Sequence, residues 1–231
     1  MMQRTSQILF AYWNEVRAGR IAPRRFEIEP SRIGSILSET FILERSGPPH
    51  VAGSPGPRSV YRYRLAGTKL CEHFGHDFRG RDFLDNWDPD DRTTLEQTLT
   101  GMSQRGGVGL ITFEASARPD PGRAITARKR LTFEALVLPL VHTSDSLDRF
   151  LGCMSPLGEP AWLGSQRLID TALLRCELIW PDGRPFPVVE KSRQQTPFMP
   201  EIRNARLVRS ERRQFRVYDG GLSKNPPRNG G

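Results

Sequence analysis

The stretch VYRYRLAGT at residues 60–68 most restricts the fold, because its polar and apolar side chains alternate as they do in a β-strand. One face carries tyrosine and leucine, and the other carries arginine and alanine: Tyr61, Tyr63 and Leu65 against Arg62, Arg64 and Ala66. TFILE at residues 40–44 predicts a second, shorter strand. The Gly-, Pro- and Ser-rich residues 46–59 predict the loop between them, so the two strands are expected to form a hairpin.

Three more strands are predicted further along the chain, at residues 108–117, 124–141 and 148–157. The turn sequences RPDPGR and HTSDSL separate them, which indicates a meander. Beyond about residue 160 the pattern is less regular. There TALLRCELIWPDG predicts either a helical turn or a strand.

An N-terminal helix is predicted from apolar residues that recur on one face and end before Gly19: Ile8, Leu9, Tyr12, Trp13 and Val16. Such a face either covers the domain's own sheet or packs against a second copy of the chain, and the sequence leaves both readings open. In the second reading, Tyr12, Trp13 and Val16 form a dimer or output surface.

Two helices are predicted between the hairpin and the later strands. Thr68 is a candidate cap for a short helix that ends at Gly75. A longer helix is expected at about 89–105, because Asp88 is a suitable cap and Pro89 suits the first helical position.

The net charge of +8 is concentrated in the C-terminal tail. Residues 1–190 hold 24 basic and 23 acidic side chains, whereas residues 191–231 hold 10 and 3. A nearly neutral body with a basic tail does not mark the whole chain as a nucleic-acid binder. We expect the tail to be partly disordered. As an alternative function, the tail would bind nucleic acid through non-specific, salt-sensitive contacts, with five candidate residues: Arg206, Arg209, Arg212, Arg213 and Arg216.

Several features predict a cytoplasmic protein without membrane insertion. No apolar run approaches the roughly 18–20 residues that span a bilayer. The N-terminus is too polar for a secretory signal. Cys71, Cys153 and Cys176 are few and odd in number, which favours reduced thiols.

The expected order of elements is a helix, two strands, a helical interval and three strands, and this order resembles that of a PAS domain. The blocks FAYWNEVRAGRIAPRRFEIEP, YRYRLAGTKLCEHFGHDFRGRDF and DRFLGCMSPL resemble the stand-alone PAS-domain proteins of alphaproteobacteria, over roughly residues 8–158. The resemblance implies an α+β fold, with a five-stranded antiparallel sheet and helices on one face. We expect an N-terminal helix and cap at 1–30, a PAS core at 31–158, a C-terminal extension at 159–190 and the basic tail at 191–231.

The resemblance also implies signal perception and protein contact rather than catalysis. A small-molecule pocket would lie between the sheet and its helices, and five residues are candidates for its lining: Tyr63, Phe74, Phe78, Phe83 and Leu99. The same five would equally serve as ordinary core. The expected partners are a protein of a signalling pathway, an unidentified small molecule and, if the N-terminal helix pairs, a second copy of the chain.

Cys71, His73 and His76 lie close together in sequence but do not form a metal motif. On a helix, His73 and His76 would lie about 160° and 140° from Cys71, so the three side chains diverge. Haem binding by His73 or His76 is suggested only by the fact that some PAS domains bind haem. Flavin photochemistry lacks its reactive cysteine, since none follows Gly75 until Cys153. We expect no metal site, and the cofactor stays unknown.

No enzyme motif emerges from the chain. GxxxxGK and GxSxG are both absent. His142, Ser144 and Asp145 fall in a single turn, where near neighbours rarely form a catalytic relay. Together with the resemblance to PAS-domain proteins, this absence predicts a non-catalytic cytoplasmic sensor or adaptor in signal transduction.

Overall fold

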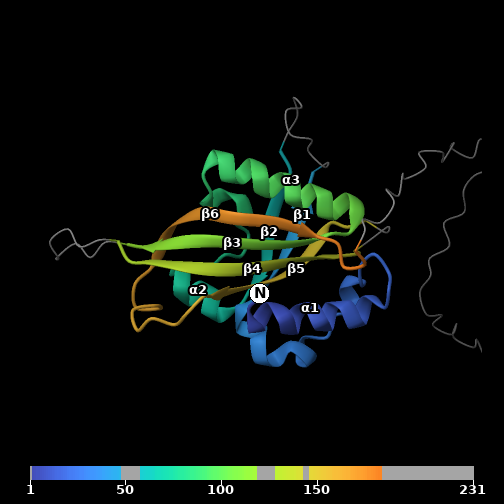
Figure 1. Cartoon of the computed structure of the whole chain (residues 1–231), viewed down its shortest axis with the longest axis horizontal. Helices are drawn as coiled ribbons and strands as arrows, with labels where there is room; N and C mark the ends of the chain where they lie inside the picture. The colour runs from blue at the N-terminus through green and yellow to red at the C-terminus, as the bar shows by residue number, and fades with distance from the viewer. Residues whose placement is uncertain (1, 48–57, 119–127, 143–145, 184–231) are drawn as a thin grey trace, which may run out of the picture. The chain divides into compact units, whose positions relative to one another are not determined.

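A six-stranded antiparallel sheet forms the centre of the protein and has helices on both faces (Figure 1). The computed structural model describes residues 2–47, 58–118, 128–142 and 146–183, which belong to one unit, Met1–Glu190. The strands are β1 (Thr40–Ser46), β2 (Val60–Ala66), β3 (Val108–Ala117), β4 (Arg130–Leu140), β5 (Arg149–Pro156) and β6 (Leu168–Ile179). Their order across the sheet is β2-β1-β5-β4-β3-β6.

The sixth strand corrects the expectation of a five-stranded sheet. β6 pairs antiparallel with β3 from Val108↔Ile179 to Ala117↔Leu168, so the irregular region after residue 160 contributes a strand and not a helical turn. Its inward side chains continue the apolar surface of β3, because Leu168, Leu173 and Leu178 pack against the core beneath it. The five strands expected from the sequence are all present, and four of them differ at their ends by at most two residues. The strand expected at 124–141 begins at Arg130, and residues 124–127 lie outside the described ranges.

The central strand β4 is buried on both faces, from Phe133 to Leu140. Its side chains alternate between two separate apolar clusters: Phe133, Ala135 and Val137 belong to one, and Leu136, Leu138 and Leu140 to the other. Antiparallel sheets often leave one face to water. Here both faces need a cover, and therefore helices lie on both sides of the sheet and not on one side alone.

The first cover consists of α2 (Thr68–Phe74), the 3-10 turn η3 (Phe83–Asn86) and α3 (Pro89–Arg105). Their ends largely follow the sequence signals. α2 stops at Gly75, whose φ of 66° suits glycine, and α3 begins after Asp88 and ends at Gly106, with a φ of 73°. The cap of α2 is Gly67 and not Thr68.

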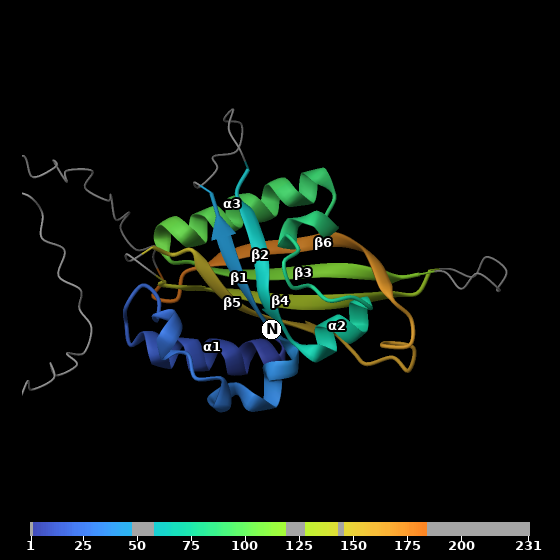
Figure 2. The same cartoon turned by 180° about the vertical axis from the view of Figure 1, so that it is seen from behind.

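The second cover consists of α1 (Arg4–Arg17) and two 3-10 segments, η1 (Arg25–Glu27) and η2 (Pro30–Glu39). Seen from behind, α1 and α3 again lie on opposite sides of the sheet (Figure 2). Trp13 is fully buried, and its Nε1 donates a 2.8 Å hydrogen bond to the carbonyl of Pro139. β3 pairs with β4 only as far as Val137. The Trp13 indole therefore supplies a hydrogen-bond donor to the β4 backbone beyond the residues that pair with β3.

Of the two readings of the apolar face of α1, the structure favours the cover of the chain's own sheet over a dimer surface at Tyr12 and Trp13. Tyr12 is 6% exposed and Trp13 0%, because both pack against the chain's own sheet, and Val16 packs half-buried against the same cluster. Arg17, only 3% exposed, lies over the Trp13 ring and donates to the Asp182 carboxylate at 2.6 Å. The apolar face of α1 therefore covers its own sheet.

Substitution of Trp13 should reduce stability in two steps. Trp13→Phe removes the donor to Pro139 and is expected to lower the free energy of unfolding by about 1–3 kcal/mol. Trp13→Ala also leaves a cavity and should cost about 3–5 kcal/mol in urea denaturation. Phe26→Leu is the control, since Phe26 is 78% exposed. Equal stability of wild type and Trp13→Ala would contradict the role assigned to this side chain.

Candidate ligand-binding site

The aromatic residues expected to line a pocket are packed together on the α3 side of the sheet. Tyr63, Phe74, Phe78, Phe83 and Leu99 belong to one buried cluster, and each is at most 4% exposed. The rings contact one another directly, with centroids 4.8 Å apart for Tyr63–Phe78 and 5.3 Å for Phe74–Phe78. The five residues selected from the sequence therefore do contact one another. Their side chains pack together and occupy the space in which a ligand was expected.

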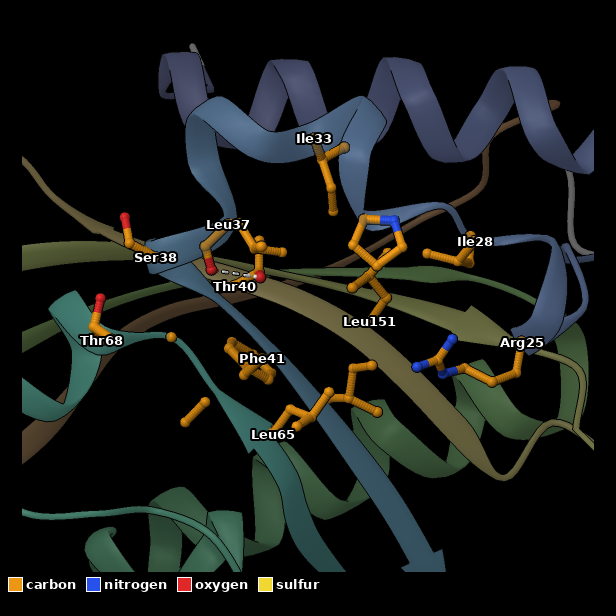
Figure 3. A pocket seen from close by; sticks show the side chains of 14 residues that line it. Arg25, Ile28, Ile33, Leu37, Ser38, Thr40, Phe41, Leu65, Thr68 and Leu151 are labelled. Atoms are coloured by element: carbon orange, nitrogen blue, oxygen red, sulfur yellow. Dashed lines mark hydrogen bonds between the residues drawn. The ribbon is translucent and has the colours of Figure 1, made fainter.

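A half-open groove of about 500 Å³ lies on the opposite face, between η2 and the β1–β2 hairpin (Figure 3). None of the five aromatic-side candidates lines it. The sheet twists strongly, so β1 and β2 run across the direction of β3 and β6 and diverge from the helices below (Figures 1 and 2). This divergence leaves part of the sheet surface without a cover.

The groove is apolar on both walls. Its floor comes from Ile42 of β1, Leu65 of β2 and Leu151 of β5, which lie in register across three neighbouring strands. The facing wall comes from η2 and the segment before it: Ile28, Pro30, Ile33 and Leu37. Leu37 and Leu65, on opposite sides, are 43% and 47% exposed, so the groove is open to solvent.

One end of the groove is closed by an unusually close contact between backbones. A Cβ placed on Gly67 would lie 2.1 Å from the carbonyl oxygen of Ser38 and 2.8 Å from that of Leu37. The amide of Gly67 also donates to the carbonyl of Thr40 at 2.8 Å. Only glycine allows this approach, so the sequence AGT at residues 66–68 fixes the end of β2 against the end of η2.

The other end of the groove carries Arg25. Its side chain extends into the groove toward Leu151 (Figure 3). The backbone of this segment is held firmly, because the Arg25 amide donates to the carbonyl of Val141 at 2.8 Å and the Val141 amide donates to Pro23 at 2.9 Å. Within the described ranges, no carboxylate forms an ion pair with the Arg25 guanidinium.

The histidines of the short helix lie beside the aromatic cluster. The His73 ring is 6.1 Å from that of Phe133, and the His76 ring is 4.4 Å from that of Phe78. Across the part of the chain that the structure describes, no three side chains of His, Cys, Asp or Glu gather as a metal site requires. The three cysteines are free, and burial raises the pKa of Cys153 to about 12.

Sequence reasoning missed the groove because no periodic pattern marks its wall. η2 is a 3-10 segment in which Ile33 and Ile36 are buried while Leu37 is exposed, and such segments lack the helical repeat that reveals a face. The available signal was the motif PRR at residues 23–25, which contains Arg25. The tail arginines Arg206, Arg209, Arg212, Arg213 and Arg216, and the expected disorder of the tail, lie outside the described residues.

Partial burial of the two histidines predicts a pH dependence of stability. Burial lowers the pKa of His73 and of His76, with Lys69 acting in the same direction on His73. The unfolded chain takes up protons near pH 6.5, whereas the folded chain resists them until a lower pH. The free energy of unfolding should therefore fall as the pH drops from about 7 toward 5.

Urea denaturation at several pH values measures this effect. The double variant His73→Gln/His76→Gln should lose less stability than the wild type over the same range, because its two glutamines do not titrate. Identical slopes for the two proteins would show that neither histidine contributes.

The comparison with protein families agrees with this architecture. The family model described as PAS domain matches residues 1–155, which include both helical covers and the first five strands but not β6. A search of curated proteins finds no match. Among the described residues, no helix is long and apolar enough to cross a membrane. With two thirds of its length matched, the chain belongs to the PAS domain family.

Proposed function

We propose that the protein is a cytoplasmic sensor and adaptor in signal transduction, which perceives a small molecule in the groove and passes the signal to a protein partner without catalysis. PAS domains are in general sensory modules of signalling proteins and are typically non-catalytic. The observation that carries the proposal is the half-open apolar groove beneath η2. Ligand pockets are typically concave, largely apolar and about 300–1,000 Å³ in volume.

The position of the groove also supports a route for the signal. Its wall, η2, is joined to α1 near both ends. At the start of η2, the Glu29 amide donates to the hydroxyl of Tyr12 at 2.7 Å. At the end, the hydroxyl of Thr5 donates to the Glu39 carboxylate at 2.6 Å. A molecule that displaces η2 would therefore also act on α1.

The outer face of α1 offers a surface for the partner. Arg4, Gln7, Asn14 and Glu15 are exposed there, while the inner face is buried in the core. A polar surface of this kind suits a reversible protein contact, because interfaces between separately stable proteins resemble the ordinary surface in polarity.

Native mass spectrometry of freshly purified full-length protein tests perception. We expect a mass excess that disappears on denaturation, and we expect Leu65→Trp to lack it because the larger ring fills the groove. Leu174→Trp is the matched control, since Leu174 is a 58% exposed leucine of an edge strand and does not line the groove. An excess retained in Leu65→Trp would place the molecule elsewhere.

Hydrogen–deuterium exchange tests the route from the groove to α1. Leu65→Trp should change the exchange rates of amides in residues 4–17, although Leu65 is on β2 and α1 is a separate helix, because η2 connects them. Leu174→Trp should leave these rates unchanged. A change confined to β1 and β2 would contradict coupling through η2.

The second candidate function, nucleic-acid binding through the tail, is favoured by one observation. Ten basic and three acidic residues fall in residues 191–231. This excess of positive charge suits non-specific contact with phosphates.

A further inference from the structure

We infer that the groove takes an aliphatic carboxylic acid, with its carboxylate on Arg25 and its chain along β1 and β2. This inference rests on the proposed function and names the chemical class of the molecule perceived. It places the ligand beside η2, where the groove borders the aromatic cluster through Phe41, which belongs to that cluster and also lines the groove.

The groove is lined mainly by apolar side chains, so it favours a ligand with an apolar chain. Its two sides expose Leu37 and Leu65, which are among the few large apolar side chains left in contact with water in the described residues. Covering them removes apolar surface from water, which is favourable in proportion to the area buried. Ile33 and Leu151 beneath them are 2% exposed, so the groove already has a fixed floor and wall.

The single positive charge among the lining residues favours a ligand with one negatively charged group. Among the described residues that line it, Arg25 alone is charged. Its guanidinium has no carboxylate partner there, and its backbone is anchored to Val141. A planar guanidinium pairs with a carboxylate through two parallel hydrogen bonds. One arginine matches the single charge of a carboxylate better than the double charge of a phosphate monoester.

The opposite end of the groove fixes the orientation of the ligand. Ser38, Thr40 and Thr68 line that end, and they carry hydroxyl groups but no charge (Figure 3). The Thr40 hydroxyl already donates to the Leu37 carbonyl at 2.9 Å. The carboxylate therefore belongs at Arg25, and the chain extends past Leu151 and Leu65 toward the hydroxyl end.

Isothermal titration calorimetry with decanoate as the probe, and 1-decanol as its uncharged counterpart, tests this inference on the full-length protein. Decanoate should bind the wild type at least about tenfold more tightly than decanol, because a charge-assisted pair is added to the same apolar contact. Arg25→Gln should abolish that difference. Arg24→Gln is the matched control, since the neighbouring arginine does not line the groove.

Leu65→Trp should prevent the binding of both probes, whereas Leu174→Trp should bind as the wild type does. Equal affinities for decanoate and decanol, absence of decanoate binding, or undiminished binding to Leu65→Trp would each overturn the inference. So would a wild-type dimer that Leu65→Trp dissociates in sedimentation velocity, because the groove would then hold a second copy.

These experiments distinguish failure of the proposed perception in the groove from failure of the inferred ligand class. A native mass excess that Leu65→Trp abolishes, together with no decanoate binding, would preserve perception in the groove and overturn the carboxylic acid. Absence of both signals would overturn the inference and remove the support for perception in the groove.

Discussion

Burial of β4 on both faces is the constraint on which the rest of the structure depends. Residues 133–140 are all buried, and the apolar side chains from Ala135 to Leu138 enter the two opposite clusters in alternation. A sheet with such a strand at its centre needs two covers, and the chain supplies one before the sheet and one within it. The N-terminal helix is therefore part of the fold, with Trp13 bonded to the β4 carbonyl of Pro139.

The two covers differ in how completely they fill the space over the sheet. On the α3 side, aromatic rings pack in tilted, edge-to-face and stacked pairs and leave Tyr63 and Phe83 at most 2% exposed. On the α1 side, a helix and 3-10 segments cover the middle strands, while the twist carries β1 and β2 away from them. A groove forms on the side with the less regular cover, which is why it lies beside η2.

Much of the fold could be predicted from sequence, because alternation along strands and capping signals are local. Residues 60–66 and 108–117 became strands as predicted, and Asp88 and Gly75 bounded helices as expected. The predicted face of residues 60–66 was wrong at Leu65, because a register shift in the pairing with β1 turns Leu65 to the groove and away from the cluster of Tyr61 and Tyr63. β6 was ambiguous because its side chains follow no clean alternation, and register shifts interrupt its pairing with β3. The groove could not be predicted, since Arg25, Ile33 and Leu65 meet only through tertiary packing.

The two edge strands of the sheet, β2 and β6, carry features that oppose pairing with a further strand. Along β6, Arg175 pairs with Glu177, and Asp170 pairs with Arg128, so charged side chains border the outermost strand. At the other edge, Tyr63 of β2 exchanges backbone hydrogen bonds with Arg81 and Gly80. Charges and covered backbone groups oppose edge-to-edge aggregation. Both edges of the sheet are thus unfavourable for the strand addition by which amyloid-like aggregates grow.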